Sequence, residues 1–100
     1  DHPDYTLMRK EDIVSGHYMR LEVSDKPGVL SEITGILASQ NVSVDRFFQE
    51  KSEDANAENA EIILLTHMCA YGKIIEVVNM LMNLENVKGK PVVFRVEEKA

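Results

Sequence analysis

The sequence predicts a single α+β domain in which two helices cover one face of an antiparallel sheet. Its 100 residues are enough for one core of ordinary size but not for two. Apolar residues make up 44% and charged residues 28% of the chain, as is typical of globular domains. The apolar residues switch between a period of two and a helical period, in the order strand, helix, strand, strand, helix, strand.

The first three periodic segments form a strand-helix-strand unit. In residues 17–24, Met19, Leu21 and Val23 alternate with Tyr18 and Arg20, which predicts a strand with one buried face. A helix is expected over residues 28–40, where apolar side chains recur at helical spacing at Val29, Leu30, Ile33, Ile36 and Leu37. Strand character returns in residues 42–49.

The second unit repeats this order. Residues 60–66 are apolar on both faces, as expected of a central strand. Residues 72–85 form a second amphipathic pattern, and residues 91–97 alternate again. Because each crossover is right-handed, both helices lie on the same face of the sheet. The prediction is a ferredoxin-like βαββαβ sandwich with four strands, of which the first and third are central.

The two ends of the chain differ in character. Residues 1–16 are polar and are interpreted as a linker or arm, with one helical turn near residues 9–14. Residues 17–100 are assigned to the folded domain, with a polar loop at 52–59. The chain does not begin with Met, so it is interpreted as part of a longer protein.

Charge and cysteine content exclude several partners. The formal net charge is −6, without a basic stripe, which argues against nucleic-acid binding. No apolar run approaches the ~20 residues of a membrane span, so no membrane partner is expected. A lone Cys69 excludes an intramolecular disulfide and suits a reducing compartment, so a cytoplasmic location is expected.

Catalysis and metal binding within this chain are not expected. Its histidines are His2, His17 and His67, and their positions show no ligand spacing with the carboxylates. His67 and Cys69 are close in sequence, but no third residue is placed to orient them for nucleophilic catalysis. They are interpreted as a strand-end histidine and a small buried thiol.

The loop between the first strand and the first helix is the candidate binding site. Pro27 suits the first turn of a helix, and Gly28 allows close approach of a ligand. The amides of Gly28, Val29 and Leu30 should lack intrahelical partners and favour a carboxylate, while Asp25 could receive an ammonium group. An ordinary turn in which Asp25 caps the helix is the alternative, and on the residues alone it is the commoner case.

The outer face of the sheet also points to a partner. Ile63 and Leu65 should face away from the helices, together with either Phe47 or Phe48. A partner is expected to cover this surface or to extend the sheet edge, and self-association is favoured. Alternatively, the side chains of Tyr18, Arg20 and Arg95 shield it.

Specific stretches of the chain resemble a known family. The strand HYMRLEV, the loop DKPGVL and the following SEITGILASQNVSVDRFFQEK are similar to an ACT domain. More narrowly, IILLTH, VKGKPVVFRVE and the approach over residues 8–16 resemble the C-terminal ACT domain of homoserine dehydrogenase. This resemblance covers residues 8–97.

The resemblance implies a regulatory role. Homoserine dehydrogenase reduces aspartate semialdehyde to homoserine with NAD(P)H in threonine and methionine biosynthesis, and threonine commonly inhibits it. Its nucleotide-binding and catalytic domains lie upstream, so no cofactor is expected in this chain and NAD(P) belongs to the upstream region. ACT domains pair, and they often bind amino acids where the first loop meets a neighbouring subunit.

Matched to this sequence, the resemblance implies an effector site and a homodimer. The site residues would be Asp25, Lys26, Pro27, Gly28, Val29, Leu30 and Ser43. Related amino-acid-binding domains often have Asn at the positions of Asp25 and Ser43, a departure that favours a weaker or differently shaped site. Threonine is the expected effector. Two alternatives stay open: a domain that only dimerises, and the ACT domain of another metabolic regulator.

Overall fold

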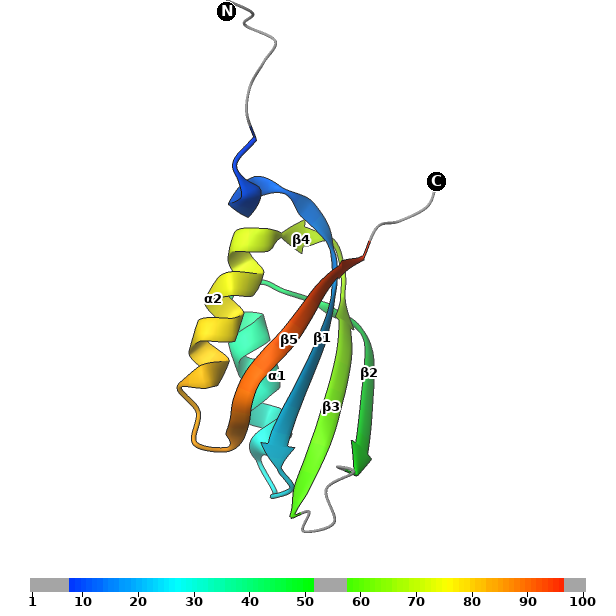
Figure 1. Ribbon diagram of the computed structural model, residues 1–100, viewed down its shortest axis with the longest axis vertical. Coiled ribbons are helices and arrows are strands. Elements are labelled where there is room, and N and C mark those ends of the chain that lie inside the picture. Colours follow the sequence, from blue (N-terminus) through cyan, green and yellow to red (C-terminus); the bar gives the residue numbers. More distant parts are fainter. Residues whose placement is uncertain (1–7, 52–57, 97–100) are drawn as a thin grey trace, which may run out of the picture.

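The predicted order of helices and strands is confirmed. The computed structural model describes residues 8–51 and 58–96, shown in Figure 1. Its elements are η1 Lys10–Asp12, β1 Val14–Ser24, α1 Val29–Ser39, β2 Val44–Lys51, β3 Asn59–Thr66, β4 Cys69–Ala70, α2 Tyr71–Met82 and β5 Val87–Val96. The short helix η1 lies within the expected helical turn, whereas the predicted loop at 52–59 falls largely outside the described residues.

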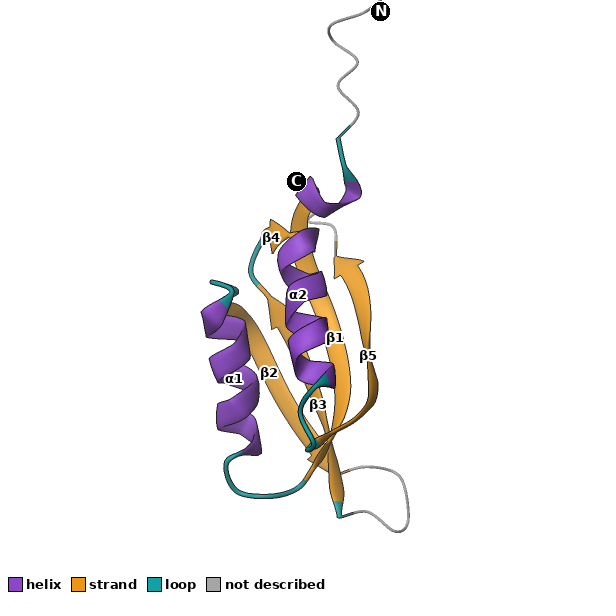
Figure 2. Ribbon diagram, turned by 90° about the vertical axis from the view of Figure 1, so that its left-hand side faces the viewer, coloured by secondary structure: helices purple, strands orange, loops and turns teal. Residues whose placement is uncertain are grey.

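The long strands form an antiparallel sheet in the order β2-β3-β1-β5. Met19 of β1 lies opposite Leu64 of β3 on one side and Val93 of β5 on the other. This register confirms that β1 and β3 are central. Both helices cover the same face of the sheet, as expected from right-handed crossovers (Figure 2).

The sheet contains a fifth strand that the sequence did not predict. β4 has only two residues, and it pairs with Val14 and Ser15. As a result β1 begins at Val14, three residues before the expected strand, and the end of the expected arm belongs to the sheet. Such a short strand shows no recognisable periodicity, since it forms only through this pairing.

The last strand is also longer than expected. β5 begins at Val87 rather than at residue 91. Gly89 has a φ of 73°, and the β1–β5 register shifts between Arg20 and Glu22. This bulge interrupts the alternation of side chains, which explains why periodicity located only the second half of the strand.

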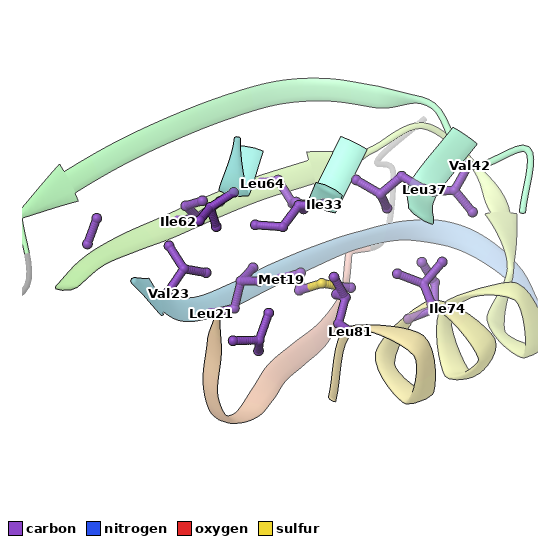
Figure 3. Packing of buried hydrophobic residues seen from close by; sticks show 14 residues of the cluster. Met19, Leu21, Val23, Ile33, Leu37, Val42, Ile62, Leu64, Ile74 and Leu81 are labelled. Atoms are coloured by element: carbon purple, nitrogen blue, oxygen red, sulfur yellow. The ribbon is translucent and has the colours of Figure 1, made fainter. Parts of the chain in front are cut away.

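The core lies between the helices and the inner face of the sheet. Met19, Leu21 and Val23 of β1 pack with residues from β3, α1 and α2 (Figure 3). The buried partners are Ile62, Leu64, Ile33, Leu37, Ile74, Val77 and Leu81. Leu30 was expected in the buried stripe of α1, but it is 40% exposed because it lies at one side of the stripe that Val29, Ile33 and Leu37 form. No helix in the described part of the chain is long and apolar enough to cross a membrane.

The outer face of the sheet carries the apolar side chains that were expected there. Ile63 and Leu65 occupy the outward positions of β3 and are half-buried. Phe47 packs against the core, whereas Phe48 is 53% exposed. The register places Phe48 directly opposite Ile63, on the same face.

Candidate functional site

The loop that joins β1 to α1 is built from backbone hydrogen bonds. The Asp25 amide donates to the Glu58 carbonyl at 2.8 Å, and the Lys26 amide donates to the Ser24 carbonyl at 3.0 Å. Asp25, Lys26, Pro27 and Gly28 are all exposed. Pro27 precedes the N-cap of α1 and does not occupy its first helical position, which corrects the expected helix start.

Gly28 is the N-cap of α1, and its backbone requires glycine. Its φ of 88° lies in the left-handed region, which side chains with a Cβ rarely adopt. A Cβ at this position would meet nothing within 4 Å, so the space beside it is open. Among the described residues no side chain caps the helix, so the alternative in which Asp25 is the cap is wrong.

Two of the three predicted free amides have no hydrogen-bond partner among the described residues. The amides of Gly28 and Leu30 donate to no backbone or side-chain acceptor there. Val29 differs, because its amide donates to the Lys26 carbonyl at 3.4 Å and its side chain is buried in the core. Val29 therefore anchors the start of α1, while Gly28 and Leu30 present donors at the positive end of the helix dipole.

Ser43 lies far from this loop within the same chain. It follows the C-terminal end of α1, and its carbonyl accepts a hydrogen bond from the His67 amide at 2.9 Å. An 11-residue helix is about 16 Å long, and α1 lies between Gly28 and Ser43 in the chain. Figure 1 shows the loop that precedes α1 and the loop that follows it at opposite ends of the helix. One chain alone does not bring the predicted site residues together.

Comparison with known proteins identifies the family of this fold and loop. The family model of the ACT domain matches residues 17–84, which include most of β1, the loop and both helices. The chain belongs to the ACT-domain family. ACT domains are regulatory modules that generally bind amino-acid effectors and often dimerise.

Several relatives of this ACT domain are homoserine dehydrogenases. The chain is 32% identical over 95 residues to homoserine dehydrogenase of Methylobacillus glycogenes, covering 95% of this chain and 23% of that protein. It is 34% identical over 91 residues to the Helicobacter pylori enzyme, covering 91% of this chain and 21% of that protein. The chain therefore spans about a fifth to a quarter of the length of these relatives.

Two solved structures are similar to this chain. The crystal structure of a homoserine dehydrogenase from Thiobacillus denitrificans superimposes with a TM-score of 0.80 at 32% identity, covering 91% of this chain and 19% of that chain. The ACT domain from GTP pyrophosphokinase of Chlorobium tepidum has a TM-score of 0.63 at 15% identity, covering 82% of this chain and all of that domain. The second similarity shows the fold alone.

His17 and Cys69 of this ACT domain lie in contact, which the sequence did not predict. Cys69 Sγ lies 3.6 Å from Nδ1 of His17, not beside the ring of His67. His67 is exposed, and its Nε2 lies 3.8 Å from Oδ1 of Asp45. Its backbone neighbour Thr66 accepts a hydrogen bond from the His17 amide at 3.0 Å. The sequence did contain a signal for the burial of His17. It lies two positions before Met19, so in a strand its side chain faces inward like that of Met19.

Burial keeps both members of this pair neutral. His17 has no exposed surface, and burial lowers its pKa, with a further contribution from the positive charge of Arg95. Burial raises the pKa of the Cys69 thiol, and a hydrogen bond with Thr66 partly opposes this effect. An activated thiolate–imidazolium pair needs shifts in the opposite directions, so the pair is built for packing and not for nucleophilic attack.

Two further features lie apart from the loop. In residues 8–51 and 58–96, no group of three or more His, Cys, Asp or Glu is placed to hold a metal ion. A groove of about 610 Å³ runs between α2 and β5, lined by Ile75, Val78 and Met82 on one side and Pro91 and Val93 on the other. None of the predicted site residues lines this groove, so the groove is not part of the predicted binding site.

Proposed function

We propose that this ACT domain binds a small amino acid, with threonine as the first candidate, at the loop between β1 and α1. The observation that carries the proposal is that the amides of Gly28 and Leu30, at the start of α1 and close in sequence to the exposed Asp25, have no partner among the residues that the structure describes. Donors at a helix N-terminus suit the carboxylate of an amino acid. The Asp25 carboxylate suits its ammonium group.

A second copy of the domain would complete this site. The two edge strands differ: β5 has Pro91 and the positive-φ Gly89 in its interior, which discourage pairing, whereas β2 has neither Pro nor Gly and its irregularity lies at its start, between Val44 and Arg46. Antiparallel pairing of two β2 edges places the start of one β2 beside the end of the other. Ser43 of the second copy would then lie at the end of the sheet that carries the Asp25 loop, so the site belongs to a homodimer.

The parent protein would be an NAD(P)-dependent homoserine dehydrogenase that acts in the cytoplasm. The homoserine dehydrogenase relatives support this proposal, and their additional length would contain the catalytic and NAD(P)-binding region. Effector binding would stabilise one arrangement of the ACT dimer. Residues 8–16 would transmit this conformational change to the catalytic region that precedes them. A coupling free energy of ~1–3 kcal/mol between the two sites suffices for useful inhibition.

One observation favours a second candidate function. Ser43 is a short side chain at the position where related amino-acid-binding domains often have Asn, which weakens the grip on a ligand. On that basis the domain would serve for dimerisation alone, without an effector.

Calorimetric titration of the chain with threonine distinguishes these functions. We expect saturable heat for the wild type and a roughly ten- to hundredfold weaker dissociation constant for Asp25→Ala, because a charge-assisted hydrogen bond contributes ~1.5–3 kcal/mol. Glu76→Ala, which removes an exposed carboxylate from α2, is the matched control and should bind as the wild type does. Absence of heat at millimolar threonine would leave dimerisation as the function.

Mixing two defective variants tests whether the site is shared between copies. Asp25→Ala and Ser43→Ala should each bind threonine weakly. In a mixed dimer, one of the two sites combines an intact loop with an intact Ser43, so an equimolar mixture should regain tight sites. A mixture that binds no better than its components would contradict the proposed role of Ser43.

A further inference from the structure

The candidate binding loop and the segment that enters the domain lie at opposite ends of β1. We call residues 9–13, which precede this strand, the connector. The strand begins at Val14 and ends at Ser24, next to Asp25, and its 11 residues are about 33 Å long. Figure 1 shows β4 and the start of β1 at one end of the sheet and the loop before α1 at the other. Within one chain, the loop is therefore far from the connector.

Ser43 lies at the same end of the sheet as the connector. Its carbonyl accepts a hydrogen bond from the His67 amide at 2.9 Å, just after the end of β3. The preceding residue, Thr66, contacts β1, since its hydroxyl oxygen accepts a hydrogen bond from the His17 amide at 3.0 Å. The end of β3 thus holds the start of β2 on one side and the start of β1 on the other.

A short segment, residues 66–71, continues from this point to the connector. Its strand β4 pairs with the first two residues of β1. Directly after β4, the Tyr71 amide donates to the Ile13 carbonyl at 2.9 Å. A single residue, the exposed Met68, separates β4 from the amide that is bonded to Ser43. One short piece of backbone is therefore bonded to the start of β2 and to the connector.

We propose that Ser43 and the connector of one chain move together through residues 66–71, so that an effector acts in trans. This regulation rests on the proposed function, in which Ser43 of one copy completes a site on the loop of the other. The loop of the first copy holds the ligand, but the connector that responds belongs to the copy that supplies Ser43. Because β4 has only two residues, it can open at a lower free-energy cost than the core strands, which suits it to such a movement.

A route within the chain that supplies the loop is the competing possibility. It would run along α1 and across its contact with α2, where Gln40 Nε2 lies 3.6 Å from Met80 Sδ. Gln40 is the C-cap of α1, so this contact lies at the end of the helix that is remote from the loop. The route through Ser43 is shorter and consists of backbone hydrogen bonds within one segment.

Amide hydrogen exchange in mixed dimers distinguishes the two routes. Asp25→Ala copies supply an intact Ser43, and Ser43→Ala copies supply an intact loop. One variant is isotopically labelled and mixed with an excess of the other, so that nearly all labelled copies lie in mixed dimers, and threonine is added at a concentration that saturates the wild type. We expect Tyr71 exchange to slow by about fivefold or more in labelled Asp25→Ala copies, an ordinary size for coupling between sites. It should not change in labelled Ser43→Ala copies.

Gly72→Leu tests the same connection without a ligand. The new side chain must displace Glu11 of the connector, because a Cβ at residue 72 would already lie 3.3 Å from Glu11 Cβ. If residues 66–71 transmit this displacement, the His67 amide should exchange about fivefold faster or more. The Asp25 amide, at the remote end of β1, should keep its rate. Lys73→Leu, at an exposed neighbouring position, is the matched control and should change neither rate.

Several results would overturn the proposal. Threonine that binds but slows Tyr71 exchange in the copies that supply the loop, in both kinds of copy equally, or in neither, would exclude action in trans. An unchanged His67 rate in Gly72→Leu would show that Ser43 is not connected to the connector. Absence of threonine binding in calorimetry would instead contradict the proposed effector function, and the ligand-free experiment would still decide whether Ser43 and the connector move together.

Discussion

At the scale of single residues, His17 is held in an entirely enclosed position where β1, β4 and α2 meet. Its Nε2 lies 3.3 Å from the Ser15 hydroxyl, its Nδ1 lies 3.6 Å from Cys69, and the Tyr71 ring packs at 6.0 Å. These partners are neutral, and the nearby charge of Arg95 is positive. The site therefore stabilises the uncharged imidazole, and protonation of His17 opposes folding.

This environment predicts a pH dependence of stability. Because the pKa of His17 is below its usual value of 6.5 when folded, the unfolded chain binds more protons as the pH falls through that value. Above about pH 7.5, His17 should contribute no pH dependence to the free energy of unfolding. Below about pH 6.5 it should fall by up to about 1.4 kcal/mol per pH unit, until the pH reaches the folded pKa.

Urea unfolding of matched variants between pH 5.5 and 7.5 checks this prediction. His17→Gln should have a shallower pH dependence than the wild type, whereas Met68→Gln, a substitution of an exposed residue that does not titrate, should retain the wild-type slope. Equal slopes for the wild type and His17→Gln would show that His17 does not titrate differently in the two states.

At the scale of elements, α1 begins abruptly at a glycine and also contains a second glycine in its middle. Gly28 has a positive φ, whereas Gly35 lies inside the helix and is exposed. A Cβ meets no atom within 4 Å at either position, so the two glycines differ in backbone conformation and not in available space. The conformation of the loop at Gly28 thus depends on its positive φ, and not on packing against a neighbouring residue.

Alanine substitutions at these glycines should have opposite effects. Gly28→Ala should lower the free energy of unfolding by about 1–2 kcal/mol, because L-residues are strained at positive φ. Gly35→Ala should raise it by about 0.5–1 kcal/mol, because alanine favours the helix and restricts the unfolded chain. Chemical denaturation of both variants measures this difference. A neutral Gly28→Ala would mean that the loop relaxes to another conformation.

At the scale of the whole molecule, the segment before β1 is attached to the N-terminal end of α2. The Tyr71 amide donates to the Ile13 carbonyl at 2.9 Å, and Lys10 Nζ lies 5.1 Å from the centre of the Tyr71 ring. A Cβ on Gly72 would approach Glu11 Cβ at 3.3 Å, so η1 rests directly on the helix. A change in the position of α2 would therefore also move residues 10–13, which precede β1.

Enlarging Gly72 should detach this segment. In Gly72→Leu the new side chain occupies the space of Glu11, so the bond between Tyr71 and Ile13 should weaken and the Tyr71 amide should exchange with deuterium at least tenfold faster. Lys73→Leu adds a similar side chain at an exposed neighbouring position and should leave that exchange unchanged. Protection of the Leu64 amide in the core should persist in both variants, which separates local release from unfolding.

Periodicity alone was sufficient to predict the two helices, the four long strands and the inward positions of Met19 and Leu64, because each of these depends on side chains repeated along one segment. The DKPGVL loop was likewise located from local chemistry. What the tertiary structure decided is which distant groups meet. It separated Ser43 from Gly28, paired Cys69 with His17 instead of His67, and created β4 against Val14. Such contacts join residues about 50 positions apart, and no local repeat encodes them, since they arise only when packed elements bring their ends together.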